Sequence, residues 1–155
     1  MDNDYKEQLK LSNQLCFPLY AAARNIINIY TPVLKKLGIT YTQYLVFLVL
    51  WEEDKIPVGD ICQKLMLDSG TLSPLLKKMQ KSGYIERKRS EKDDRVVVIS
   101  LTEEGKDMME RAKNVPKEVG DCIKISPEKA KMLYEILYEL LENKFQEVLK
   151  NENSL

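Results

Sequence analysis

The segment between Leu65 and Gly105 constrains the fold more than any other part of the chain. It reads LMLDSGTLSPLLKKMQKSGYIERKRSEKDDRVVVISLTEEG. A helix end, a turn and a second helix that stops at Gly83 are followed by a short strand, a charged loop and an apolar strand. This order is typical of a helix-turn-helix followed by a β-hairpin wing. We therefore expect a mainly α-helical fold with a small β-hairpin.

Apolar residues also recur at helical spacing before this segment. Pro18 either kinks the first of these helices or lies in the first turn of its main part. In the helix that ends at Gly83, Pro74 allows two starts: the helix either starts late, with Ser73 as cap, or begins at Ser69 and bends. The predicted helices run from Leu11 to Leu37, from the capping box at Thr40 to Trp51, from Val58 to about Leu67, and from there to Gly83.

The chain after this point combines the wing with further helices. Strands are expected at Tyr84–Lys88 and Arg95–Leu101, a fifth helix after the cap Thr102, a break at Pro116 and Gly120, and a last helix opened by Ser126-Pro127. Because the first and last helices carry apolar stripes that the winged core cannot cover, we expect a homodimer. The expected division is one domain over 1–155, with dimerisation helices at 10–37 and 104–150 and a winged region at 40–102.

Charge is unevenly distributed along a chain whose net charge is zero. Between Lys77 and Arg95 there are eight basic and four acidic residues, which leaves a local surplus of +4. A local positive surplus attracts phosphates even when the whole protein is neutral. A winged fold with this charge predicts binding to double-stranded DNA, and a two-fold dimer matches a pseudo-palindromic operator.

The composition argues against several other classes of protein. The absence of histidine removes histidine-based catalysis and histidine-containing metal sites, and the three cysteines show no CxxC spacing, so no metal or cofactor is expected. The sequence has no run of about 18 apolar residues and no signal-like N-terminus, so we expect a cytoplasmic protein with no membrane partner.

Several motifs resemble one family. Asp93-Asp-Arg-Val-Val-Val-Ile-Ser-Leu-Thr102 resembles the DxR…LT signature of the MarR family of dimeric winged-helix regulators. Leu15-Cys-Phe-Pro-Leu-Tyr-Ala21, Gly38-Ile-Thr-Tyr-Thr-Gln-Tyr-Leu45 and Leu67-Asp-Ser-Gly-Thr-Leu-Ser-Pro-Leu-Leu76 are similar to the organic-hydroperoxide-sensing repressors within that family. The resemblance covers about residues 10 to 105 and is weak from Met108 onward.

This resemblance implies a redox switch rather than an enzyme. In the subfamily, a peroxide oxidises one cysteine near the start of the first helix, and the dimer then releases DNA; the matching residue is Cys16. Two tyrosines of the partner subunit that support the thiolate match Tyr30 and Tyr41, and Tyr20 lies near that pocket. One branch has a resolving cysteine that forms an intersubunit disulfide, and Cys122 lies in a comparable region. Without it, a small thiol would cap the sulfenic acid.

The resemblance also assigns the DNA contacts. Arg95 is expected in the minor groove with Asp93 orienting it, and Asp68 is expected to cap its helix. The remaining contacts divide into hydroxyls for the major groove (Ser69, Thr71 and Ser73), lysines for phosphates (Lys77 and Lys81) and wing cations (Arg87, Lys88, Arg89 and Lys92).

Two alternatives to this interpretation remain open. One is a MarR-type repressor that a small ligand releases by binding in the cleft between the winged and dimer regions. The other is a thiol peroxidase that uses Cys16, against which the missing histidine and CxxC pair argue.

Overall fold

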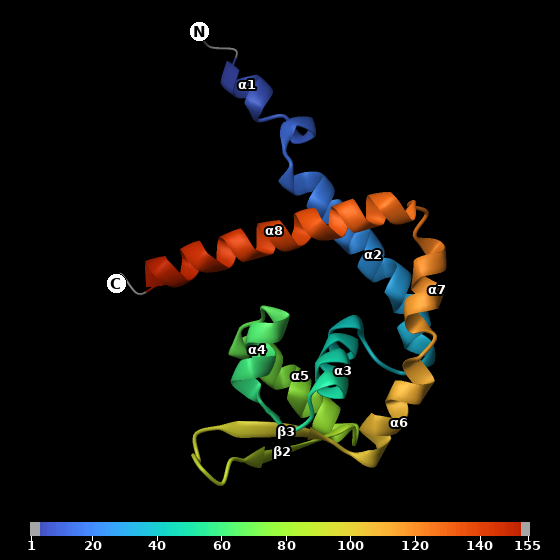
Figure 1. Cartoon of the computed structure of the whole chain (residues 1–155), viewed down its shortest axis with the longest axis vertical. Coiled ribbons are helices and arrows are strands. Elements are labelled where there is room, and N and C mark those ends of the chain that lie inside the picture. The colour runs from blue at the N-terminus through green and yellow to red at the C-terminus, as the bar shows by residue number, and fades with distance from the viewer. Residues whose placement is uncertain (1–3, 153–155) are drawn as a thin grey trace. The chain divides into compact units, whose positions relative to one another are not determined.

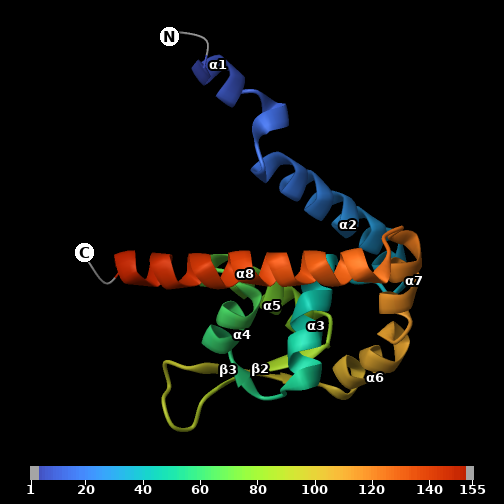
Figure 2. The same cartoon turned by 45° about the horizontal axis from the view of Figure 1, so that its top comes forward.

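The computed structural model describes the backbone of residues 4–152 and the side chains of residues 5–142. The chain forms two compact units, residues 1–122 and residues 123–155. The expected fold class is confirmed, since helices dominate and the strands form one small antiparallel sheet (Figure 1). Figures 1 and 2 show α3, α4 and α5 grouped on one side of the β2–β3 hairpin.

The first long helix, α2, begins later than the apolar pattern predicted. It spans Cys16–Lys36, and a short helix α1 (Asp4–Gln8) and a 3-10 turn (Leu11–Asn13) precede it. Pro18 is the third residue of α2, so the first-turn alternative is confirmed, because the missing N–H has no intrahelical partner at that position. Gly38, with φ of +74°, ends the helix as expected.

The second long helix, α3 (Tyr41–Glu52), is the buried centre of the first unit. The predicted capping box is present: Gln43 N–H donates to Thr40 Oγ1 at 3.3 Å and Thr40 N–H donates to Gln43 Oε1 at 2.8 Å. Phe47 is fully buried and stacks on Trp51, with ring centroids 5.2 Å apart. Burial on nearly every face explains why this helix is apolar throughout.

The helix-turn-helix consists of α4 (Val58–Leu65) and α5 (Ser69–Lys81). The turn includes Met66 in the left-handed region and Asp68, whose carboxylate accepts the Thr71 N–H at 2.8 Å. The cap fixes the start of α5 at Ser69, so the late start at Ser73 is wrong and Pro74 lies inside the helix. Buried apolar side chains anchor α5: Leu72, Leu76 and Met79.

The wing is a three-stranded antiparallel sheet in the order β1-β3-β2. The hairpin strands β2 (Ile85–Arg89) and β3 (Val97–Leu101) lie within one or two residues of the predicted ranges. The sequence did not predict β1 (Ile56–Pro57), which pairs Ile56 with Ile99. This short strand ties the start of α4 to the base of the wing.

After the wing come α6 (Glu103–Ala112) and α7 (Val115–Cys122). Thr102 caps α6 as predicted, accepting the Gly105 N–H at 3.1 Å. The predicted break near Pro116 is confirmed, because α6 ends at Ala112 and Pro116 falls in the first turn of a new helix, α7. A break at Gly120 is wrong, because Gly120 lies inside α7.

The second unit contains α8 (Pro127–Glu152), which starts after Ser126 as predicted. Within this chain its described apolar side chains are largely exposed, among them Leu133, Ile136, Leu140 and Leu141. The side chains of the predicted stripe beyond residue 142 lie outside the described residues. Across the described chain no single helix is long and apolar enough to cross a membrane, and α2 with α3 meets that test only as a pair bent by 78°.

Candidate DNA interface and thiol site

Helix α5 presents a polar face opposite its buried stripe. Ser69, Thr71, Lys77 and Lys81 are exposed, and Ser73 is half-buried. The Thr71 hydroxyl donates to Asp68 Oδ2 at 2.7 Å, and this bond together with the Thr71 backbone bond holds the pKa of the Asp68 carboxyl below its usual value. Asp68 is therefore engaged as a cap, as predicted, and the helix start is rigid.

The tip of the wing carries an oriented arginine. Arg95 Nε and Nη2 donate to the two carboxylate oxygens of Asp93 at 3.2 and 3.3 Å, and the Arg95 N–H donates at 2.9 Å. These bonds lower the pKa of Asp93, first through the side chain of Arg95 and then through its backbone. Because the Arg95 side chain is 90% exposed, the bonds to Asp93 orient a guanidinium group that projects into solvent.

The other wing cations do not share one environment. Lys88 pairs with Glu86, Arg89 Nη1 donates to the Asp94 carbonyl at 3.2 Å, and Lys92 is exposed. Arg87 differs from all of them: it is half-buried rather than part of an exposed hairpin tip, and its Nε is buried.

Cys16 is the first residue of α2 and is exposed. Its apolar neighbours are exposed as well: Leu15 by 79%, Phe17 by 43% and Leu19 by 45%. One turn further on, the Tyr20 hydroxyl accepts a hydrogen bond from Arg24 Nη1 at 3.3 Å. An accessible thiol with apolar neighbours can react directly with an apolar reagent.

Tyr30 and Tyr41 lie together at the corner between α2 and α3. Their ring centroids are 4.9 Å apart, and the buried Tyr44 ring lies 5.9 Å from Tyr30. Burial, and secondly the neighbouring Tyr30, raise the pKa of Tyr41, so this phenol keeps its proton and remains a hydrogen-bond donor.

One chain does not bring Cys16 to these tyrosines. Cys16 and Tyr30 are 14 residues apart on α2, which places them about 21 Å apart along the helix axis. A site containing Cys16, Tyr30 and Tyr41 therefore requires a second copy of the chain.

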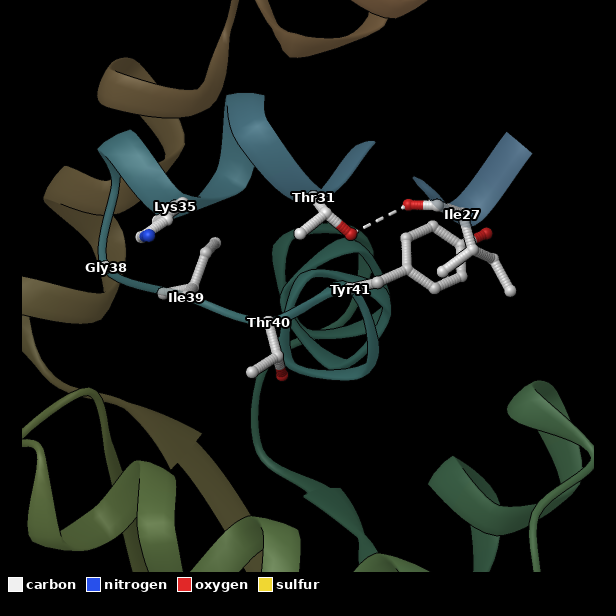
Figure 3. A pocket seen from close by; sticks show the side chains of 7 residues that line it. All are labelled: Ile27, Thr31, Lys35, Gly38, Ile39, Thr40 and Tyr41. Carbon is white, nitrogen blue, oxygen red and sulfur yellow. Dashed lines mark hydrogen bonds between the residues drawn. The ribbon is translucent and has the colours of Figure 1, made fainter. Parts of the chain in front are cut away.

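The same corner contains a cavity of about 510 Å³ that sequence reasoning missed. Figure 3 shows the Tyr41 ring beside Ile27 and the Thr31 hydroxyl bonded to the Ile27 carbonyl, at 3.1 Å. Part of its lining belongs to the Gly38–Leu45 motif, but that motif alone reveals no cavity, since the walls come from two helices and their turn. It is lined by Ile27, Thr31, Lys35, Gly38, Ile39, Thr40 and Tyr41.

Cys122 is the last residue of α7 and is exposed, with its thiol donating to the Glu118 carbonyl at 3.3 Å. Helix α7 packs beside the far end of α2, where Lys36 pairs with Glu118 at 3.4 Å. Cys16 lies about 30 Å along α2 from Lys36, whereas Cys122 is about 6 Å from Glu118. A disulfide needs Cα atoms within about 7 Å, so these two cysteines of one chain cannot pair.

Cys62 shows the properties of a structural thiol. It is half-buried in α4, and its burial, followed by the nearby Asp68 carboxylate, raises the pKa of the thiol. The thiolate, which is the reactive form, is therefore disfavoured at this position.

Known proteins are similar to this chain in sequence and in fold. A family model described as transcriptional regulator SarA/Rot matches residues 28–112. The organic hydroperoxide resistance transcriptional regulator of Bacillus subtilis is 48% identical over 146 residues, covering 94% of this chain and 99% of the relative. SarZ of Staphylococcus epidermidis is 38% identical, with the same coverage of both chains.

Solved structures of AbfR, also 38% identical, include a reduced form bound to DNA (TM-score 0.74; 91% of this chain and 98% of that chain). A disulfide-containing form of AbfR matches with a TM-score of 0.62 over 91% of this chain and 99% of that one. The two sequence relatives are transcriptional regulators, and the AbfR structures align with this fold over nine-tenths of the chain. The chain belongs to the MarR-type winged helix-turn-helix regulators, in the group that contains the organic hydroperoxide resistance regulator and SarZ.

Proposed function

We propose that this protein is a homodimeric transcriptional repressor that binds a pseudo-palindromic DNA operator and releases it when an organic hydroperoxide oxidises Cys16. The observation that carries the proposal is an exposed thiol at the first residue of a 21-residue helix in a winged helix-turn-helix chain. The names of the relatives support it, since one is a hydroperoxide resistance regulator and another was solved both on DNA and with a disulfide. A DNA-binding role of this kind places the protein in the cytoplasm.

In the DNA-bound state, the polar face of α5 enters the major groove and the wing reaches the minor groove. Ser69, Thr71 and Ser73 read base edges, while Lys77 and Lys81 contact phosphates. Arg95, oriented by Asp93, suits the narrow and negative minor groove, with Lys88, Arg89 and Lys92 beside the backbone. Residues 10–37 and 104–150 form the dimer around the winged regions at 40–102.

The sensing step is a two-electron oxidation of sulfur. The Cys16 thiolate attacks the outer oxygen of the hydroperoxide, an S–O bond forms, and the O–O bond breaks. The sulfur becomes a sulfenic acid, and the peroxide is reduced to an alcohol after the leaving alkoxide takes a proton. The positive end of α2 and the phenols of the partner's Tyr30 and Tyr41 stabilise the thiolate, with Tyr20 at the edge of the pocket.

Cys122 of the partner subunit resolves the sulfenic acid in this proposal. Its thiolate attacks the oxidised sulfur, a disulfide forms and hydroxide leaves as water after protonation. The argument for an intersubunit bond is geometric, because one chain holds Cys16 and Cys122 too far apart. Cys122 is also exposed and is therefore accessible to a partner.

The test is DNA release measured by fluorescence anisotropy after addition of cumene hydroperoxide. Wild-type protein should leave the duplex, and Cys16→Ser should remain bound at the same peroxide dose. Cys62→Ser is the matched control and should release normally. Release of Cys16→Ser as fast as wild type would contradict the proposal.

A non-reducing gel tests the second step separately. Oxidised wild type should run as a covalent dimer that Cys122→Ser loses. Monomers alone from oxidised wild type would reject the resolving role and leave a small thiol as the capping group.

The cavity beside Tyr41 favours one second candidate, a repressor released by a non-covalent ligand. Its lining combines apolar side chains with Lys35, Thr31 and Thr40, a combination that suits a small amphiphile. A ligand that releases the Cys16→Ser variant from DNA would support this function. A third function, turnover as a thiol peroxidase, would require peroxide consumption beyond one equivalent per subunit in the presence of a thiol reductant.

A further inference from the structure

A second cavity, of about 520 Å³, opens between the helix-turn-helix and the wing. Its walls come from three separate elements: the first turn of α4 with Gly59 and Asp60, the middle of α5 with Ser73, and the hairpin with Arg87 and Arg95. The cavity therefore lies between the helix assigned to the major groove and the arginine assigned to the minor groove.

Arg87 lines this cavity and is half-buried, unlike the exposed wing cations. In the β2–β3 register it lies opposite Ile99, which is fully buried, so its stem follows the face of the sheet that the helices cover. Its Nε is buried, and no described side chain or backbone group accepts a hydrogen bond from it. A buried N–H without an acceptor is costly, so an anionic oxygen that entered the cavity and accepted this bond would stabilise Arg87 there.

The groups around Arg87 suit a single anion. Arg87 and Arg95 both line the cavity, Asp60 is the one acidic residue of the lining, and the Ser73 hydroxyl can donate. Because Asp93 already pairs with Arg95, Arg87 is the cation left for an incoming anion. The first turn of α4 adds free backbone N–H groups, because its N-cap, Pro57, forms no side-chain cap. Gly59 leaves open space where a side chain would otherwise narrow the approach.

We propose that this cavity clamps one phosphate of the DNA strand that runs between the major and the minor groove, with Arg87 as its deep donor. Adjacent grooves of B-DNA are separated by one sugar-phosphate backbone. A protein that places α5 in one groove and Arg95 in the next must seat that backbone between them, where the cavity lies. The inference rests on the proposed DNA-binding function and gives Arg87 a role distinct from the solvent-exposed wing cations.

The experiment compares Arg87→Met, which keeps the stem and removes the charge, with Lys64→Met. Lys64 lies in the last turn of α4 and pairs with Glu53 at 3.3 Å, so its loss removes the same charge away from the cavity. Reduced protein is titrated between about 50 and 200 mM salt onto a duplex that wild type has selected from a random library, and onto unselected duplex.

Arg87→Met should bind both duplexes about tenfold more weakly, with a salt-dependence slope lower by about one phosphate. Lys64→Met should match wild type, and Arg87→Lys should keep the wild-type slope. Because Arg87 Nε has no partner in the free protein, Arg87→Met should melt at or above the wild-type temperature without DNA.

Two outcomes would overturn the inference: an unchanged slope for Arg87→Met, or a lower melting temperature with unchanged DNA affinity, which would mark Arg87 as structural. Failure of the wild type to bind any duplex would instead refute the proposed function, so the two failures are distinguishable.

Discussion

Replacing Gly105 with alanine should destabilise the protein at the junction between the wing and α6. Gly105 is buried in the first turn of α6, where a Cβ would overlap the Tyr84 carbonyl oxygen and approach Leu101 Cδ2 to 3.0 Å. The obstacle is backbone and cannot swing away as a flexible side chain would. The start of α6 must therefore move, although three hydrogen bonds tie it to Gly83, Tyr84 and Trp51.

Those bonds set the size of the effect. Thr102 N–H donates to the Tyr84 carbonyl at 3.1 Å, Thr102 Oγ1 to the Gly83 carbonyl at 2.6 Å, and Trp51 Nε1 to the Gly105 carbonyl at 3.2 Å. Overpacking against the backbone lowers the free energy of unfolding by about 3 kcal/mol, and the loss of one hydrogen bond lowers it by about 1 kcal/mol. The higher helix propensity of alanine raises it by about 1 kcal/mol. The net loss of about 3 kcal/mol corresponds to a melting temperature lower by roughly 6–12 °C.

Thermal unfolding followed by circular dichroism, at equal protein concentration, measures this shift. Gly59→Ala is the matched control, because a Cβ there meets nothing within 4 Å and should leave the melting temperature unchanged or slightly raised. A Gly105→Ala protein that melts with or above wild type would refute the packing argument.

Three further substitutions test other parts of the structure. Thr40→Ala removes the capping box of α3 and should cost about 1 kcal/mol, or roughly 2–4 °C in a thermal melt; an unchanged melt would count against the cap. Tyr41→Phe keeps the ring packing but loses the donor, so Cys16 oxidation should slow about tenfold in a sulfenic-acid trapping assay, whereas Tyr44→Phe should not slow it. Asp93 has a lowered pKa, so its bond to Arg95 persists above its unfolded pKa and is lost only as the pH falls through the lower folded value. Between about pH 6 and 8 the ionisation of Asp93 should therefore cause no change in DNA affinity. Asp93→Asn should weaken DNA binding at every pH in that range. A variant that binds DNA as tightly as wild type would exclude the orienting role of Asp93.

Local signals in the sequence predicted the elements well where one residue type fixes the backbone. Thr40 with Gln43 marked the start of α3, and Gly38 and Gly83 marked two helix ends, both with φ near +75° as required. The hairpin was predictable because Val97, Val98 and Ile99 favour strands and a polar loop precedes them.

Features that depend on distant parts of the chain were not predictable in this way. The two-residue strand β1 exists only because Ile56 finds Ile99 across the sheet. Gly120 indicated a second break after the one near Pro116, yet it lies inside α7, which packs against α2. The burial of Arg87 likewise follows from its register opposite Ile99, which no local pattern reveals.

The positions of the thiol and the tyrosines indicate which winged region an oxidised Cys16 affects. The first turn of α2 is exposed in its own chain, so a new oxygen on Cys16 disturbs few contacts there. Tyr30 and Tyr41, in contrast, lie where α2 meets α3, and the bond from Trp51 to Gly105 connects α3 to the first turn of α6, which directly follows the wing. On the proposed function, oxidation of Cys16 in one subunit therefore acts first on the partner's α2–α3 corner, and through α3 on the partner's wing. Such a crossed route requires no signal to travel the roughly 31 Å length of α2, and it makes release of DNA a property of the dimer.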